Sequence, residues 1–396
     1  MANISTLRAV PASQKGALRR PRATRLTLFP TAAPNGIREF RDASSPPPAS
    51  HRSSKPAEEL VGIARLAASS PLADAKRGTE YFVLPVRSIL NNCDSPRVPF
   101  NWTVNPYRGC EFGCRYCYAR YTHEFMELDG GEFERKIFVK KDAGALVKSD
   151  LQSKRICGEH IAIGTATDPY QPAEGEFGVT RSILEQMAER EGLSLSITTK
   201  SDRVVRDIDL LKRIAERSSL TVNLSVTTLR TRLARMLEPR APRPDLRLAA
   251  VRRLRDAGLA AGVFAMPILP GITDGEEDLD ALARAARDAG AQWFAGNVLF
   301  LMPASFKQFL PFIESHFPKL AARYREWYLQ RANAPEAYRN EITGRIREVR
   351  KKYGLGSRPQ PGPEPAARSS QLSLKLGNAM WPGEQPHMKP LIDSIV

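Results

Sequence analysis

The feature that most limits how this 396-residue chain can fold is a repeated alternation of short apolar runs with amphipathic helical patterns. Six runs rich in apolar and β-branched residues each lead into a polar or Gly/Pro-bearing turn, which is typical of buried strands. The runs are WTVNP, HIAIGTATD, LSLSITTKS, LTVNLSVTT, AAGVFAMPIL and WFAGNVLFLM. Helical patterns fall between them at residues 180–191, 204–217, 245–257 and 276–289.

This alternation predicts an α/β fold with a parallel sheet and right-handed crossover connections. Six strand–helix repeats favour a partial (βα)6 barrel, with chemistry on the loops at the carboxyl ends of the strands. We therefore expect a core barrel over residues 101–303, preceded by a lead-in segment over 81–100. Residues 304–355 are expected to add C-terminal helices, because charged helical patterns continue at 321–353 outside the repeat.

Both ends of the chain have the composition of flexible segments. Residues 1–80 are rich in Pro, Ser, Arg and Ala and contain SSPPPASHRSSKP, so they lack the apolar surface that would offset the entropy of ordering. We predict a disordered basic tail over 1–80 and a flexible tail over 356–396. A transit peptide is the alternative for the first segment, because it would also be basic and poor in acidic residues.

The charge balance bears on partners and location. The formal net charge is +16, and seven basic side chains lie within residues 1–38, which hold no acidic residue. Nucleic acid is therefore a candidate partner, although a basic tail is more often solvated chain. No run approaches the ~18 consecutive apolar residues of a membrane helix, and no apolar stretch follows the N-terminal charges as in a secretory signal. We expect no membrane association and a cytoplasmic location, where thiols stay reduced.

Three of the five cysteines lie within eight residues of one another. The stretch NPYRGCEFGCRYCYARYTHEF places Cys110, Cys114 and Cys117 after the first predicted strand, where a helix is expected to begin. Under reducing conditions this spacing indicates metal binding or catalysis. Three soft thiolates suit zinc, for which His123 is a candidate fourth ligand, or iron–sulfur. On a four-iron cluster, three ligands leave one iron open to a substrate or cofactor.

The Cys-x3-Cys-x2-Cys motif, with Tyr116 before its third cysteine and a strand before its first, resembles the radical SAM superfamily. In that family the open iron of a 4Fe-4S cluster chelates S-adenosyl-L-methionine, and one electron cleaves this cofactor to a 5′-deoxyadenosyl radical that abstracts hydrogen from substrate. The resemblance implies that Cys110, Cys114 and Cys117 hold the cluster and that Tyr116 borders the adenine. It also implies an electron donor such as flavodoxin or ferredoxin.

Further segments resemble the branch of this superfamily related to spore photoproduct lyase, over roughly residues 101–303. They are GTATDPYQPAE, ITTKSDRVVRDIDLL, NLSVTTLR, LEPRAPRP and GVFAMPILPGITD. The resemblance implies that Lys200, at the end of the third strand, meets the methionyl carboxylate of the cofactor. It gives Ser225, at the end of the fourth strand, a polar contact with the cofactor. A solvated lysine and a hydroxyl used for packing are the plain structural alternatives.

Two further strand ends carry candidate residues. Asp168 ends the second strand, where a carboxylate is a candidate for binding a ribose hydroxyl, positioning substrate or capping a turn. Met266 and Pro267 end the fifth strand, where they either line the cofactor pocket or pack as ordinary apolar residues. The sequence leaves these alternatives open.

One departure from the resemblance concerns the hydrogen donor. Spore photoproduct lyase uses a cysteine near the end of its second strand, whereas Thr165 stands at that place here, and its O–H bond is too strong to donate hydrogen to a carbon radical. Cys157 is expected at the opposite end of that strand, and Cys93 is expected to be an incidental thiol. The leading hypothesis is therefore a radical SAM enzyme of unassigned substrate. The alternatives are lyase-like repair of a DNA lesion and a non-catalytic, metal-stabilised nucleic-acid-binding protein.

Overall fold

The computed structural model describes residues 59–357 and 359, apart from residues 77, 94–97, 153–155 and 157. The predicted tails therefore lie outside the described residues over 1–58 and over most of 356–396. Within the described part of the chain, no helix is both long and apolar enough to cross a membrane.

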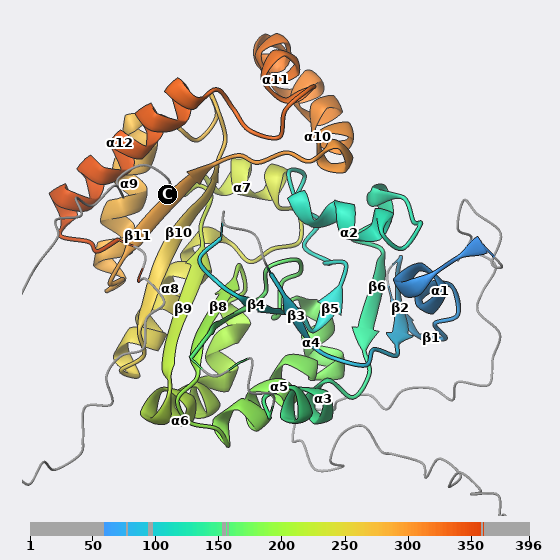
Figure 1. The fold of residues 1–396 in the computed structure, drawn as a ribbon. Helices are drawn as coiled ribbons and strands as arrows, with labels where there is room; N and C mark the ends of the chain where they lie inside the picture. The colour runs from blue at the N-terminus through green and yellow to red at the C-terminus, as the bar shows by residue number, and fades with distance from the viewer. Residues whose placement is uncertain are drawn as a thin grey trace, which may run out of the picture.

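A seven-stranded sheet forms the centre of the molecule, in the order β11-β10-β9-β8-β7-β4-β3 (Figure 1). Its strands are β3 (Leu90–Asn92), β4 (Trp102–Val104), β7 (His160–Ile163), β8 (Ser194–Thr199), β9 (Ser219–Ser225), β10 (Ala261–Ile268) and β11 (Phe294–Val298). The strands from β4 to β11 are parallel and follow chain order, whereas β3 pairs antiparallel with β4. All six predicted strands are present, so the predicted α/β class with consecutive parallel strands is confirmed.

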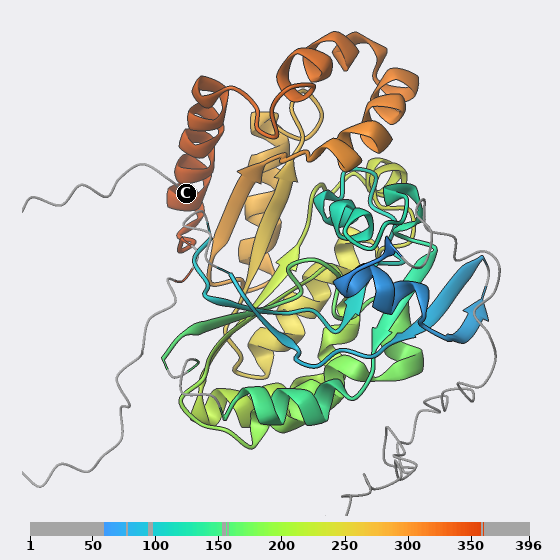
Figure 2. The same cartoon turned by 45° about the vertical axis from the view of Figure 1, so that its right-hand side comes forward.

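The connecting helices lie beside the strands that they join (Figures 1 and 2). They are α3 (Ala143–Asp150), α4 (Pro172–Phe177), α5 (Val179–Ala188), α6 (Ile208–Arg217), α7 (Thr231–Leu237), α8 (Pro244–Asp256) and α9 (Glu276–Asp288). Helix α6 shows why they dock: Leu210, Leu211 and Ile214 recur at helical spacing and are buried, while charged residues face outward. A short 3-10 helix, η5 (Asp202–Asp207), precedes α6 and takes up the start of the helix predicted at 204–217.

A second, four-stranded sheet lies beside the first, in the order β1-β2-β6-β5. Its strands are β1 (Leu72–Lys76), β2 (Thr79–Leu84), β5 (Tyr107–Arg108) and β6 (Lys136–Lys140), with α1 (Gly62–Ala68) packed against it. The prediction that the chain is disordered as far as residue 80 is therefore wrong for residues 59–76 and 78–80. Phe82 and Leu84 are fully buried against Phe138 and α1, and apolar residues of the segment itself, Ile63, Leu66, Ala67 and Leu72, join the same cluster, so the segment has apolar surface that offsets the entropy of ordering.

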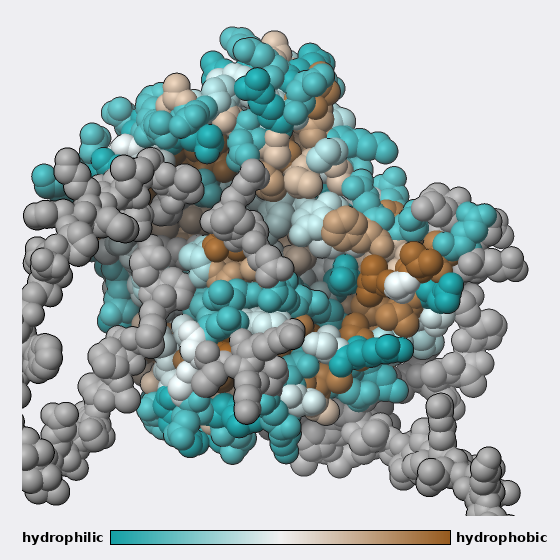
Figure 3. All heavy atoms as spheres, viewed as in Figure 1, coloured by the Kyte–Doolittle hydropathy of each residue, from teal (hydrophilic) through white to brown (hydrophobic). Residues whose placement is uncertain are grey.

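The C-terminal part of the described chain is helical, as expected. It consists of α10 (Pro303–His316), η6 (Pro318–Leu320), α11 (Ala321–Tyr328) and α12 (Glu336–Tyr353). Helix α12 packs against α9 and β11, and residue Gly356 bridges to Trp293 beside the edge strand β11. The view in Figure 3 is largely hydrophilic, with apolar side chains gathered over α1 and the adjoining strands.

Candidate cluster and cofactor site

The three predicted cluster cysteines lie on one loop, residues 109–117, which follows β5 and is called the cluster loop below. Cys110, Cys114 and Cys117 are free thiols, and the first two are only 8% exposed. Burial raises the pKa of Cys110, and the nearby Asp168 and the two other thiols raise it further. The three sulfurs therefore lie close enough to one another to interact.

The cluster loop needs glycine at its first residue. Gly109 has φ +83°, and a Cβ there would lie 2.7 Å from the carbonyl oxygen of Lys136. The carbonyl oxygen of Gly109 accepts hydrogen bonds from Thr167 Oγ1 at 2.6 Å and from Gln171 Nε2 at 3.1 Å. Arg120 donates to the carbonyl oxygen of Cys114 at 3.2 Å. Buried polar side chains thus fix the loop from the β7 end and from its own C-terminal side.

The helix expected after the cysteines is short. The chain forms η2 (Tyr118–Arg120) and α2 (Tyr121–Glu124), followed by the short 3-10 helix η3 (Gly130–Glu132). Glu127, at φ +56°, lies in the left-handed region just beyond α2, where the helical path has ended.

His123 is a core residue rather than a fourth ligand in this structure. Its Nε2 lies 3.0 Å from the carbonyl oxygen of Lys136, and its ring packs edge-on against Phe133 and Phe138. Burial lowers the pKa of His123 to about 3. Among the described residues no three His, Cys, Asp or Glu side chains converge as they would on a single metal ion. The single-zinc alternative therefore has no support in the geometry.

The donor set fits an iron–sulfur cluster. Three thiols lie together on one loop, none of them in a disulfide, and thiolates are the usual protein ligands of such clusters. Positive charge stands nearby, since Lys200 and Arg120 each lower the pKa of Cys117 against the effect of burial. A cluster with thiolate ligands is anionic, so neighbouring cations favour its binding.

A buried ion network lies next to the thiols and includes Lys200. Its ammonium is 3.8 Å from Glu238 Oε1 and 5.9 Å from the centroid of the Tyr116 ring. Glu238 forms a fully buried ion pair with Arg247 and accepts hydrogen bonds from Thr227 Oγ1, at 2.8 Å, and from the Tyr116 hydroxyl. Lys200 is thus a partly buried, oriented cation at the end of β8, and not a freely solvated strand-end residue.

Charge pairing sets the protonation state of Glu238. Burial raises the pKa of this carboxyl, but Arg247, Lys200 and their hydrogen-bonding neighbours outweigh burial and lower it to about 2. Arg247 also donates from Nη1 to the carbonyl oxygen of Ser225 at 3.0 Å, which ties α8 to the end of β9. Glu238 is therefore ionised and fixed, and it holds the Lys200 ammonium in place.

Asp168 connects the ends of β7 and β8. One carboxylate oxygen accepts from Thr199 Oγ1 at 2.6 Å and from the backbone nitrogen of Tyr170 at 2.9 Å. The other accepts from the backbone nitrogen of Lys200 at 2.7 Å. These contacts match the predicted turn-capping alternative, and a contact with the cofactor stays a prediction.

The remaining candidates lie at or near the ends of β7, β9 and β10. Ser225 is buried at the end of β9, and Met266 and Pro267 stand near the end of β10, with the carbonyl oxygen of Met266 accepting from Thr227. Thr165 is held by Asn105, whose Nδ2 donates to its hydroxyl at 3.0 Å. Cys157 lies outside the described residues.

Aromatic residues gather beside the strand ends and the cluster loop. Tyr118 is 39% exposed and stacks on Tyr121 at 6.4 Å between ring centroids, while its hydroxyl donates to the carbonyl of Thr165. Phe300, just after β11, contacts Tyr118 edge-on at 6.3 Å, and Phe125, 63% exposed, contacts Tyr121 at 5.2 Å. We call Tyr118, Tyr121, Phe125 and Phe300 the aromatic platform.

Sequence reasoning missed several residues of this site. Glu238 and Arg247 were not assigned a role, although the first stands in the quoted segment LEPRAPRP. Gln171 and Asn105 were also missed, because their hydrogen bonds join residues about 60 positions apart. Only the presence of a charged or amide residue next to a predicted strand end could have drawn attention to them.

Comparison with known proteins extends these observations. Residues 104–283 match the family model described as Radical SAM superfamily. The chain is 33% identical over 310 residues to an uncharacterized protein of Mycobacterium tuberculosis, a match that covers 78% of this chain and 90% of that protein. It is 34% identical over 175 residues to an uncharacterized protein of Methanocaldococcus jannaschii, covering 44% of this chain and 63% of that one.

Among solved structures, the fold is similar to a variant of spore photoproduct lyase with AdoMet and a dinucleoside spore photoproduct bound. The TM-score is 0.52 at 19% identity, and the match covers 70% of this chain and 80% of that one. At this identity the likeness concerns the fold alone. Together with the family match and the cysteine loop at the start of the parallel strands, these findings show that the chain belongs to the radical SAM superfamily of enzymes.

Proposed function

We propose that Cys110, Cys114 and Cys117 hold a 4Fe-4S cluster and that the chain binds S-adenosyl-L-methionine beside it to start a radical reaction on a substrate. The observation that carries the proposal is the placement of three unpaired thiols, two of them buried and one partly buried, next to the oriented ammonium of Lys200. These groups meet near the carboxyl ends of parallel strands, where α/β folds of this kind place their chemistry.

The roles of the chain's own residues follow from their contacts. When bound, the reduced cluster and S-adenosyl-L-methionine supply a 5′-deoxyadenosyl radical that abstracts hydrogen from the substrate. Lys200 offers its ammonium to the methionyl carboxylate, and Glu238 and Tyr116 hold that ammonium in place. Ser225 offers a hydroxyl from the next strand. Tyr118 and Phe300, in contact with each other, shield the proposed cofactor site from water.

The test is reconstitution of the purified protein with iron and sulfide under anaerobic conditions. A reductant and S-adenosyl-L-methionine are then added. We expect about four irons per chain and release of 5′-deoxyadenosine. Alanine at any one of Cys110, Cys114 and Cys117 should abolish the cluster absorbance, whereas Cys93→Ala should keep it. A cluster that survives loss of one of the three thiols would refute the ligand assignment.

A second candidate function, action on a nucleic-acid lesion, is favoured by the aromatic platform and the nearby guanidinium of Arg108. Arg108 forms no ion pair within the described residues, whereas Lys140 is buried, and burial together with Arg108 lowers the pKa of Lys140 to about 7, so that it is only partly charged at neutral pH. Arg108 also lies near Tyr121. Burial raises the pKa of Tyr121, and the charge of Arg108 lowers it. Stacking rings next to an unpaired cation are what a base and its phosphate require.

This second function makes its own prediction. A fluorescent single-stranded oligonucleotide should bind more weakly to Tyr118→Ala and to Arg108→Gln than to the natural protein, and 5′-deoxyadenosine release should persist in both. Repair of a thymine photoproduct should nevertheless be absent or poor, because Thr165 replaces the thiol donor. Nucleic-acid binding with no cofactor cleavage by the reconstituted protein would instead support the non-catalytic alternative.

A further inference from the structure

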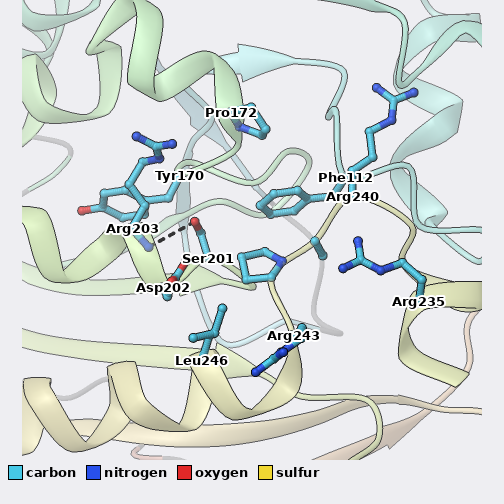
Figure 4. Close-up of a pocket in the computed structure, with 12 residues that line it drawn as sticks. Phe112, Tyr170, Pro172, Ser201, Asp202, Arg203, Arg235, Arg240, Arg243 and Leu246 are labelled. Atoms are coloured by element: carbon cyan, nitrogen blue, oxygen red, sulfur yellow. Dashed lines mark hydrogen bonds between the residues drawn. The ribbon is translucent and has the colours of Figure 1, made fainter. Parts of the chain in front are cut away.

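An arginine-rimmed hollow lies against the outer side of the cluster loop. It has a volume of about 650 Å³, and its walls come from the segments that follow β7, β8 and β9 (Figure 4). Four arginines, Arg203, Arg235, Arg240 and Arg243, surround it, and Phe112 and Leu246 contribute apolar wall. The hollow is bounded by the starts of α4, η5 and α8, whereas Lys200 turns its ammonium toward Glu238, so this is a different surface from the proposed cofactor site.

The hollow touches the cluster loop directly through Phe112, which stands between the proposed ligands Cys110 and Cys114. Two backbone hydrogen bonds join the loop to the opposite wall. Arg240 donates to the carbonyl oxygen of Phe112 at 3.2 Å, and Arg115 donates to that of Leu237 at 2.9 Å. A molecule seated in the hollow is thus separated from the proposed cluster by little more than the loop that holds it.

The hollow is lined by four arginines and one acidic residue, Asp202, so its rim is positively charged. All four arginines are exposed, and only Arg243 has a carboxylate partner, Asp245 at 2.5 Å; within the described residues the other three form no ion pair. Arg203 forms no side-chain hydrogen bond among those residues, and Arg240 reaches only Thr79 Oγ1, at 3.4 Å, and a carbonyl oxygen, at 3.5 Å. The guanidinium groups of Arg203 and Arg240 are therefore available to an anionic partner.

The apolar residues on this surface are those of a protein interface. Leu246 is 41% exposed, and Phe112 contributes an aromatic side chain to the same wall. Arginine and aromatic residues are enriched where proteins bind one another, and small contacts are typical of electron-transfer pairs. The surface therefore combines a cationic rim with a modest apolar centre.

We propose that this surface docks a small acidic electron-donor protein of the flavodoxin or ferredoxin class. One electron leaves the donor's reduced cofactor and enters the oxidised cluster, so the donor is oxidised by one electron, the cluster is reduced by one, and no atom is transferred. Because electron transfer slows steeply with distance, the donor must seat near the cluster loop, as this surface allows. The proposal rests on the cluster assignment made under Proposed function.

The experiment compares full-length reconstituted protein with Arg203→Glu/Arg240→Glu and with a control, Arg253→Glu/Arg284→Glu. The control residues are exposed on α8 and α9, and both variants change the net charge equally. Binding of oxidised flavodoxin is measured by calorimetry, and reduction of the cluster by reduced flavodoxin is followed by stopped-flow absorbance at low salt. We expect the first variant to bind roughly tenfold or more weakly and to be reduced correspondingly more slowly, whereas the control is unchanged.

Dithionite, a small reductant that needs no docking surface, should reduce all three proteins at one rate, and all three should share one unfolding midpoint. Equal flavodoxin binding and reduction in the two variants would overturn the proposal. The proposal would also be overturned if Arg203→Glu/Arg240→Glu bound flavodoxin and was reduced by it as the natural protein is, but bound a single-stranded oligonucleotide more weakly. The surface would then serve nucleic acid. Failure of the natural protein to assemble any cluster would refute the proposed function itself, a result recognised before the variants are compared.

Discussion

Two carboxylates flank the cluster loop, the partly buried Asp168 and the buried Glu238, and their loss of contact with water is compensated in opposite ways. Asp168 has both oxygens occupied by a hydroxyl and two backbone N–H groups, and burial raises its pKa. Glu238 faces the cations Arg247 and Lys200, which lower its pKa to about 2 despite its burial. The first carboxylate shapes a strand end, whereas the second maintains a fixed negative charge.

Lys200 connects the two carboxylates. Its backbone nitrogen donates to Asp168 at 2.7 Å, and its ammonium lies 3.8 Å from Glu238. Asp168 therefore sets where the lysine stands at the end of β8, and Glu238 sets where its charge points. If this division is right, the two carboxylates should differ in what their loss does to stability and to cofactor binding.

The largest effect is expected for Glu238→Gln. This change leaves the buried Arg247 without a counter-charge, which should lower the free energy of unfolding by about 3–5 kcal/mol. Urea unfolding of the cluster-free protein measures it. Glu238→Gln/Arg247→Met removes both charges and should cost less than the single change. A loss below about 1 kcal/mol for Glu238→Gln is what an exposed ion pair gives, and it would contradict our account of Glu238 and Arg247 as a buried pair.

The contribution of Glu238 to the free energy of unfolding should depend on pH. The folded-state pKa of Glu238, about 2, lies below its ordinary value of 4.5, so the unfolded chain takes up the proton first. Its stabilisation is complete above the ordinary value and is lost as the pH falls from 4.5 toward 2. The difference in unfolding free energy between the natural protein and Glu238→Gln should therefore shrink over that window. A difference that is constant with pH would disprove this account.

Lys200→Met sharpens the comparison by removing the shared cation. The affinity for S-adenosyl-L-methionine should fall by the ~1.5–3 kcal/mol of a charged hydrogen bond, roughly tenfold or more, while the cluster absorbance persists. Equilibrium binding to the reconstituted protein, measured by calorimetry, tests this. If affinity is unchanged, the ammonium serves only to balance Glu238.

Asp168→Asn should have the smallest effect on stability, about 1–2 kcal/mol, because an amide keeps one acceptor but turns an N–H toward the backbone nitrogen of Lys200. Thermal unfolding of the cluster-free protein measures it, with Thr199→Val as a control that removes one donor to the same carboxylate. A loss as large as that of Glu238→Gln would mean that Asp168 is also a charge-pairing residue.

The sequence alone predicted what local pattern determines. The four helical patterns between the strands correspond to α5, to η5 with α6, to α8 and to α9, with ends shifted by at most a few residues. Period-3.6 apolar spacing and β-branched runs act over a single element, so they can be read without knowing the rest of the fold. The spacing of Cys110, Cys114 and Cys117 is likewise local, and it predicted the family that the comparisons confirm.

What only the tertiary structure decided depends on contacts between distant positions. The second sheet escaped prediction because β5 has two residues and β1 reads LADAK, and each becomes a strand only by pairing with a neighbour. His123 looked like a ligand in sequence but lies between phenylalanines contributed by other segments. Glu238 became a functional candidate through Lys200, 38 positions earlier, because charge pairing depends on distance in space and leaves no periodic trace along the chain.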